Sequence, residues 1–172
     1  MIFFGDILVL TEPIGAPDSR HGKREAERRA VAVMVASLFG AEARYCHTPD
    51  GAPYIEGRPE HISVSHGAGL AAIAVSPRPV GIDVECRRPQ LERVAPRFLD
   101  ADECQRYATP DQLLRAWTAK EAAFKAASVS GLVISAIRLP DLSHALLPDG
   151  RRLSVSYWRE GDVMLAIAEE SD

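Results

Sequence analysis

The sequence predicts an α+β protein that forms one unit over residues 1–172, with two lobes at about 1–88 and 89–172. Strand-like segments surround one long helix in the first half, and helices followed by further strands fill the second. A length of 172 residues suits one ordinary domain or two small lobes that share a core. The chain contains no exact internal repeat and no low-complexity segment. These observations favour a single two-lobed α+β unit.

The first half of the chain predicts one strand, one helix and three further strands. Apolar residues predict a strand at 2–10, and Ser19 and Gly40 are suited to begin and end a helix over 20–39. The sequence DGAP at 50–53 predicts a turn. Apolar segments separated by Gly and Pro predict the three later strands, at 61–66, 70–76 and 80–85.

The second half predicts helices and then strands. Asp100 and Glu103 have the spacing of a capping box, which marks a helix N-terminus. A longer helix begins near Pro110 and continues to Ala127. Three strands are expected after it, at 134–139, 152–158 and 164–168.

Composition excludes several classes of protein. Hydrophobic residues make up 47% and charged residues 26% of the chain, as in ordinary globular proteins and unlike disordered tails or collagen. The 24 acidic residues exceed the 20 lysines and arginines, and the net charge of −4 argues against a protein that grips the nucleic-acid backbone. Three widely spaced cysteines, and no signal or membrane-spanning segment, predict a reduced, soluble, cytoplasmic protein.

The strand at 80–85, VGIDVE, carries two carboxylates on one face. Asp83 and Glu85 are two residues apart, so their side chains point to the same side of the strand. Two carboxylates without His or Cys favour a hard, oxygen-binding ion such as Mg²⁺, and Mn²⁺ is a second possibility. The alternative is a half-buried strand with a solvated polar face. Gly81 would allow another backbone to approach closely.

The helix over 111–127 carries charge beside its apolar stripe. At about 100° per residue, Leu113, Trp117 and Phe124 form the stripe, and Lys120 and Glu121 flank it. Arg115 and three alanines occupy the opposite side, which is the reverse of an ordinary amphipathic helix.

Buried charge requires a partner or a bound ion, so this helix is expected to face a ligand. Glu121 would supply a third metal carboxylate, and Lys125 a phosphate-binding ammonium. The alternative is a structural ion pair between these two residues, which are four apart. Lysine is scarce, with 17 arginines among the 20 strong bases, and Lys120 and Lys125 both lie on this helix. A lysine reaches a single phosphate oxygen as a point charge, which favours the ligand-facing interpretation.

Two further segments are candidates for binding an anion. Ser63, Ser65 and His66 end a predicted strand just before Gly67, where hydroxyls, an imidazole and free N–H groups can form an anion pocket. The basic residues at the start of the first helix are a second candidate, or else a solvated face; they are Arg20, Lys23, Arg24 and Arg28.

Two linked motifs give the sequence a resemblance to a known family. VGIDVE at 80–85 and WTAKEAAFK at 117–125 resemble the bipartite signature of the 4'-phosphopantetheinyl transferase superfamily. That signature is a G-(I/V)-D strand followed by (W/F)-(S/T/C)-x-K-E-(A/S)-x-x-K on a helix, and every defined position is present. SVSHG at 63–67 resembles the family's S-x-S-H box, and DGAPYI at 50–55 resembles its G-K-P loop. The resemblance extends from about Arg20 to Lys125.

The resemblance implies transfer of the 4'-phosphopantetheine arm of coenzyme A to a serine of an acyl or peptidyl carrier protein, with release of adenosine 3',5'-bisphosphate. It implies that Asp83, Glu85 and Glu121 bind Mg²⁺, and that Asp83, Glu121 and Lys125 are the catalytic residues. Lys125 would stabilise or protonate the leaving group. Glu121 or a metal-bound water would take the proton of the carrier serine. The carrier could belong to fatty-acid, polyketide or nonribosomal-peptide synthesis.

The resemblance also implies a set of coenzyme contacts, and one departure affects it. Ala52 replaces the lysine common in the G-K-P loop, so one cationic contact is missing, and Arg20, Lys23 or Arg24 is expected to compensate. The implied coenzyme-binding residues are Arg20, Lys23, Arg24, Ala52, Pro53, Ser65, His66, Lys120 and Lys125. Of these, Lys120 is expected either to be structural or to bind phosphate more distantly.

The implied fold is that of the two-lobed, surfactin-synthetase-activating type in a short form. It has two pseudo-symmetric α+β lobes with the active site in the cleft between them. Glu85 is characteristic of this type, and a monomer is expected. Because carrier proteins are usually acidic, docking requires a local basic surface, for which Arg87, Arg88, Arg93 and Arg97 are the candidates.

Two other functions are compatible with parts of the sequence. A non-catalytic homologue that binds coenzyme A or a carrier would fit the loss of lysine at Ala52. A metal-dependent nuclease would fit paired acids near a lysine, but the net negative charge opposes it.

Overall fold

The computed structural model describes residues 1–15 and 19–171. Its first half contains β1 (Ile2–Phe4), β2 (Ile7–Pro13), α1 (Arg20–Phe39), β3 (Tyr45–His47), β4 (Pro53–Ile55), β5 (His61–Gly67) and β6 (Leu70–Ser76). Its second half contains β7 (Val80–Cys86), α2 (Gln90–Val94), η1 (Ala95–Arg97), α3 (Ala101–Arg106), α4 (Pro110–Ala127), η2 (Ile134–Ala136), β8 (Arg138–Asp141), β9 (His144–Leu146), β10 (Arg152–Glu160) and β11 (Val163–Glu170).

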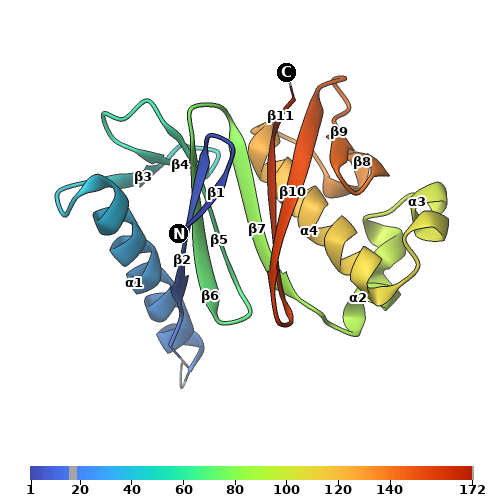
Figure 1. The fold of residues 1–172 in the computed structure, drawn as a ribbon, viewed down its shortest axis with the longest axis horizontal. Coiled ribbons are helices and arrows are strands. Elements are labelled where there is room, and N and C mark those ends of the chain that lie inside the picture. The colour runs from blue at the N-terminus through green and yellow to red at the C-terminus, as the bar shows by residue number, and fades with distance from the viewer. Residues whose placement is uncertain (16–18, 172) are drawn as a thin grey trace.

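Two antiparallel sheets, each covered by one long helix, make up the molecule (Figure 1). The first sheet has the strand order β1-β2-β6-β5, and the second has the order β7-β11-β10-β9-β8. A two-stranded ribbon of β3 and β4 lies beside the first sheet. The layers follow one another as α1, first sheet, second sheet and α4 (Figure 1). The predicted α+β class is confirmed.

Apolar side chains from both sheets form a core between them. Val9 and Ala72 of the first sheet pack with Ile82, Val84 and neighbouring apolar residues of the second. These strands alternate, so their other faces contact the covering helices. β7 forms its ladder with β11. The chain therefore leaves the first hydrogen-bonded sheet after β6 and enters the second with β7. This crossing comes before the lobe boundary predicted near residue 88.

The predicted limits of α1 are confirmed. Ser19 caps its N-terminus by accepting a hydrogen bond from the Gly22 backbone N–H at 3.0 Å. Gly40 ends the helix with a φ of 93°, which favours glycine. Met34 and Val35 pack against the first sheet and bury the inner face of the helix.

Two strand predictions are wrong. Residues 2–10 form a hairpin because Gly5 adopts a φ of 57° and reverses the chain, so that Phe4 pairs with Ile7. Residues 134–139 begin as the 3₁₀ turn η2, and only then enter β8. Local apolar patterning does not distinguish one strand from a tight hairpin, or a short strand from a helical turn.

The helix α4 packs its alanine face on the second sheet. Ala119 and Ala122 have no exposed surface, whereas Phe124 is 36% exposed. The predicted apolar stripe is therefore wrong at Phe124 and incomplete, since Leu113 is buried and Trp117 packs against the core, but the alanines form most of the buried face. Small side chains face the sheet because the helix lies unusually close to it.

Gly81 of β7 explains this close approach, as its sequence position predicted. A Cβ atom on Gly81 would lie 1.9 Å from the Ala122 carbonyl oxygen and 2.6 Å from the Ala126 nitrogen. The backbone of α4 therefore occupies the space that any side chain at position 81 would need. In the described ranges, no helix is long and apolar enough to cross a membrane.

Candidate functional site

The site is built where the two sheets meet, along the outer edge of β7. Since β7 is an edge strand, its outward N–H groups need partners from outside its own sheet. Ser63 and Ser65 of β5 supply them, because the Ile82 N–H donates to Ser63 Oγ at 3.1 Å and the Val84 N–H donates to Ser65 Oγ at 3.2 Å. Two serine hydroxyls thus join the sheets in place of a strand ladder.

Asp83 lies at the centre of the junction and is mostly buried. Its Oδ1 atom accepts hydrogen bonds from Ser65 Oγ and from Lys125 Nζ, each at 2.9 Å. Lys125 Nζ also donates to the Ile82 carbonyl at 2.8 Å. This arrangement places the carboxylate of β7 and the ammonium of α4 side by side.

Glu121 lies beside this pair on α4. Burial raises the pKa of the Glu121 carboxyl, the negative charges of Asp83 and Glu85 raise it further, and Lys125 opposes them. Within the described chain, its carboxylate forms no hydrogen bond or ion pair. Three carboxylates therefore share one partly desolvated region, where their mutual repulsion favours the arrival of a cation.

Glu85 completes the acidic group but is engaged by the chain itself. Its Oε2 atom forms an ion pair with the Arg88 guanidinium, and its Oε1 atom accepts from the Cys86 N–H at 3.1 Å. Among the residues that the structure describes, no group of three His, Cys, Asp or Glu side chains is placed to hold a metal ion. Oxygen donors from Asp83, Glu85 and Glu121 suit a hard divalent cation in their chemistry. For all three to bind it, Glu85 would exchange Arg88 for the ion.

Lys120 is not part of the site, so the prediction that it contacts the coenzyme is wrong. Its side chain is fully buried, and Nζ donates to Glu103 Oε2 and to the Phe98 carbonyl, each at 2.7 Å. Lys120 faces the core together with the alanines of α4. It therefore joins α4 to α3 and cannot meet a ligand.

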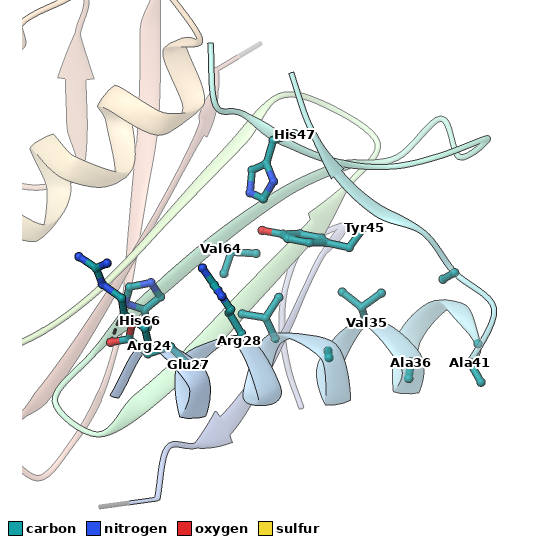
Figure 2. A pocket seen from close by; sticks show the side chains of 14 residues that line it. Arg24, Glu27, Arg28, Val35, Ala36, Ala41, Tyr45, His47, Val64 and His66 are labelled. Atoms are coloured by element: carbon teal, nitrogen blue, oxygen red, sulfur yellow. Dashed lines mark ion pairs between the residues drawn. The ribbon is translucent and has the colours of Figure 1, made fainter. Parts of the chain in front are cut away.

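A cavity of about 440 Å³ lies in the first half, between α1, the β3 strand and β5 (Figure 2). Apolar side chains form its wall, among them Val31, Val35 and Val64, and polar side chains gather toward one end. Arg24 and Arg28 project into it from α1, and His66 projects from β5 (Figure 2).

The cavity and the carboxylate group meet at consecutive residues of β5. Ser65 faces β7 and His66 faces α1, as alternation along a strand requires. His66 Nδ1 lies 3.4 Å from Glu27 Oε1, and Lys23 Nζ lies 3.8 Å from the same oxygen. The cationic end of the cavity and Asp83 therefore lie on opposite faces of the same strand, β5.

The other predicted coenzyme contacts are placed less directly. Lys23 is largely exposed and, like Ala52 and Pro53, does not line the cavity. The Ala52 N–H donates to Thr48 Oγ1 at 3.1 Å within the turn between β3 and β4. The side chain of Arg20 lies outside the described residues.

Sequence reasoning missed part of the cavity. Glu27 follows Lys23 by four residues, and this helical spacing could have identified it. Arg28 was already among the basic candidates of the first helix, and it does line the cavity. Tyr45 and His47 also line the cavity, but they belong to a three-residue strand without a local sequence signal.

Comparison with known proteins identifies the family. The sequence model of the 4'-phosphopantetheinyl transferase superfamily matches residues 79–166, which are more than half of the chain. This range runs from β7, with its carboxylates, through α4 and into β11. The chain therefore belongs to the 4'-phosphopantetheinyl transferase superfamily.

A curated relative is the 4'-phosphopantetheinyl transferase of Bacillus subtilis. The two sequences are 34% identical over 113 residues, which cover 58% of this chain and 50% of the relative. The chain thus spans about half the length of the curated relative that it matches.

Proposed function

We propose that the protein transfers the 4'-phosphopantetheine arm of coenzyme A to a serine hydroxyl of an acyl or peptidyl carrier protein. The observation that carries the proposal is the arrangement of Asp83, Glu121 and Lys125 at the junction of the sheets, within a chain of this family. Carboxylates with an adjacent ammonium suit phosphoryl transfer, which depends on charge neutralisation and positioning.

In this reaction the carrier serine oxygen forms a bond to the β-phosphorus of coenzyme A. The bond from that phosphorus to the bridging oxygen breaks, and adenosine 3',5'-bisphosphate leaves with the electron pair. The serine proton passes to a base, and the leaving oxygen gains negative charge. Two groups of the chain are therefore needed, one to accept a proton and one to stabilise an anion.

Glu121 is suited to accept the proton. Its carboxylate forms no hydrogen bond or ion pair within the described chain, so it is available to a proton from the carrier serine. Lys125 is suited to stabilise the leaving oxygen, because its ammonium lies beside Asp83 and is partly open to solvent.

A divalent cation, Mg²⁺ or in its place Mn²⁺, would be held by Asp83, Glu85 and Glu121. When bound, such an ion supplies neutralisation of the pyrophosphate charge and polarisation of the attacked phosphorus. Three neighbouring carboxylates, with repulsion that raises the pKa of Glu121, support this part of the proposal.

The coenzyme would enter by the cavity of the first half. Arg24, Arg28 and His66 line it and present positive charge or hydrogen-bond donors to phosphate groups. Arg28 would compensate for Ala52, where related sequences commonly have lysine. Ser65 is less suited to this role, because its hydroxyl is already bonded to Asp83 and Val84.

The carrier would dock beside β7. Arg87, Arg88, Arg93 and Arg97 are all exposed and follow this strand, so they would form a basic surface next to the carboxylates. One chain supplies β5, β7 and α4, which supports a monomer as the active unit. We place this activity in the cytoplasm.

Intact-mass measurement of an apo carrier protein, incubated with coenzyme A, Mg²⁺ and this protein, tests the proposal. The expected result is a mass gain of one phosphopantetheine, lost when the carrier serine is replaced by alanine. No gain with fatty-acid, polyketide and nonribosomal-peptide carriers would overturn it. Coenzyme binding without transfer would instead indicate the non-catalytic homologue.

A further inference from the structure

Ser63 and Ser65 form the same contact with the edge of β7. Each is buried, with 3% and 6% of its surface exposed, and each hydroxyl accepts a backbone N–H of β7. Both therefore help to hold β5 against β7. If this were the whole of their role, the two serines would be equivalent.

Ser65 makes one contact that Ser63 does not. Its hydroxyl donates its single proton to Asp83 Oδ1 while accepting from the Val84 N–H. Lys125 donates to the same oxygen. Asp83 Oδ2 receives no hydrogen bond from any residue in the described chain, and it is not closed off from solvent.

The two donors differ in what they do when a substrate binds. Lys125 is partly exposed, and in the proposed reaction its ammonium turns toward a phosphate oxygen. Asp83 then loses that donor. Ser65 is buried on β5, and among the described residues its hydroxyl donates to Asp83, so its bond to Oδ1 is expected to persist.

We propose that Ser65 is a positioning residue, which fixes the Asp83 carboxylate through Oδ1 so that Oδ2 is presented to a divalent cation. This inference rests on the proposed function. Groups that orient metal-binding side chains typically change metal affinity or activity about 10- to 100-fold when removed.

Ser65→Ala, Ser63→Ala and Ser65→Thr test the inference, with Ser63→Ala as the matched control. Three quantities are measured for each variant. They are the urea midpoint of unfolding, kcat with KM for coenzyme A, and Mn²⁺ affinity in the presence of coenzyme A by electron paramagnetic resonance.

Both alanine variants are expected to lose stability, Ser65→Ala somewhat more, because it loses two hydrogen bonds between β5 and β7 and Ser63→Ala loses one. Only Ser65→Ala is expected to lose about 10-fold or more in kcat and in Mn²⁺ affinity, while KM for coenzyme A stays nearly unchanged. Ser65→Thr keeps the hydroxyl and is expected to recover most of both. If Ser65→Ala does not fold, Ser65→Cys keeps the volume with a weak donor and replaces it in the comparison.

The inference would be overturned if Ser63→Ala and Ser65→Ala lost equal amounts of kcat and Mn²⁺ affinity. It would also be overturned if Ser65→Ala kept full kcat and full Mn²⁺ affinity. A wild-type protein that transfers nothing would overturn the proposed function instead, and the Mn²⁺ titration would still decide the role of Ser65. No Mn²⁺ binding by the wild type would overturn both.

Discussion

Lys120 Nζ lies 2.7 Å from Glu103 Oε2, and both side chains are buried almost completely. Glu103 also accepts the Leu139 N–H at 2.6 Å and the Asp100 N–H at 2.9 Å. One carboxylate thus joins α3, α4 and β8. The first lysine of the family signature is a structural residue in this protein.

Lys120→Met is expected to destabilise the fold by about 3 to 5 kcal/mol, because it leaves the Glu103 carboxylate buried without its cation. Urea unfolding measures the loss. Lys23→Met is the control, since Lys23 is exposed and its pair with Glu27 is long at 3.8 Å, so a change within about 0.5 kcal/mol is expected. A stable Lys120→Met protein with a raised KM for coenzyme A would contradict the structural assignment.

Gly81→Ala is expected to prevent α4 from docking on β7. The new Cβ would lie 1.9 Å from the Ala122 carbonyl, and a backbone group cannot move aside as a side chain can. Destabilisation at or above the upper end of ordinary overpacking, about 3 kcal/mol, is expected. Gly15→Ala meets no atom within 4 Å and serves as the control in the same circular-dichroism unfolding experiment. Near-wild-type stability of Gly81→Ala would show that the helix can shift.

Arg28→Ala is expected to raise KM for coenzyme A about tenfold or more, through loss of a charge-assisted contact at the cavity. The adjacent Arg29 is 77% exposed and, among the described residues, pairs with Glu25 alone, so Arg29→Ala provides a matched control. Initial rates at varied coenzyme concentration separate the two. An unchanged KM in Arg28→Ala would remove this cavity from the proposed coenzyme path.

Glu121→Gln is expected to separate stability from activity. The folded pKa of Glu121 is raised, so the folded state binds its proton more readily than the unfolded chain. The folded state is therefore not destabilised by Glu121 at low pH, where the carboxyl is protonated. It loses free energy of unfolding as the pH rises through the raised pKa and the buried carboxylate ionises.

Without divalent cations, Glu121→Gln should match the wild type at low pH and exceed its stability above the raised pKa. Its transfer rate should fall about 100-fold or more. Urea unfolding across pH and the carrier mass assay measure these effects, and the exposed Glu25→Gln is the control. Wild-type activity, or lower stability than the wild type at high pH, would contradict the assignment.

Arg93→Glu with Arg97→Glu is expected to raise KM for an acidic carrier about tenfold, with KM for coenzyme A unchanged. Both side chains are exposed and neither contacts the carboxylates in the structure. Arg58→Glu, an exposed position in the first half, controls for net charge. An unchanged carrier KM, or an equal rise in Arg58→Glu, would refute docking at this surface.

Features with local causes could be predicted from the sequence. Ser19 and Gly40 determine the limits of α1 by capping, and Asp100 with Glu103 forms the predicted capping box of α3. Asp83 and Glu85 were recognised because residue alternation along a strand is also local. The resemblance of two motifs added Glu121 and Lys125.

Features that depend on distant partners could not be predicted. The buried face of α4 is set by Gly81, which lies far from Ala122 in the sequence. Helical periodicity alone assigned Phe124 to that face and the alanines to the opposite one, because apolar size usually indicates burial. Ser65 was assigned to a ligand, and Lys120 to a ligand or a structural role, because nothing near them in the sequence identifies Asp83 or Glu103 as their partners.

The strand β7 is contacted by β11 along one edge, by the serines of β5 along the other, and by the backbone of α4 over one face. Each contact is tight, and two involve positions where no larger residue fits: Gly81 beneath α4, and Gly67, whose added Cβ would lie 2.3 Å from the Val84 carbonyl. The backbone positions of Asp83 and Glu85 are therefore fixed by these contacts. Their spacing depends on how the two sheets pack. A substitution in the core between the sheets is therefore expected to lower the transfer rate before it measurably lowers the stability of the fold.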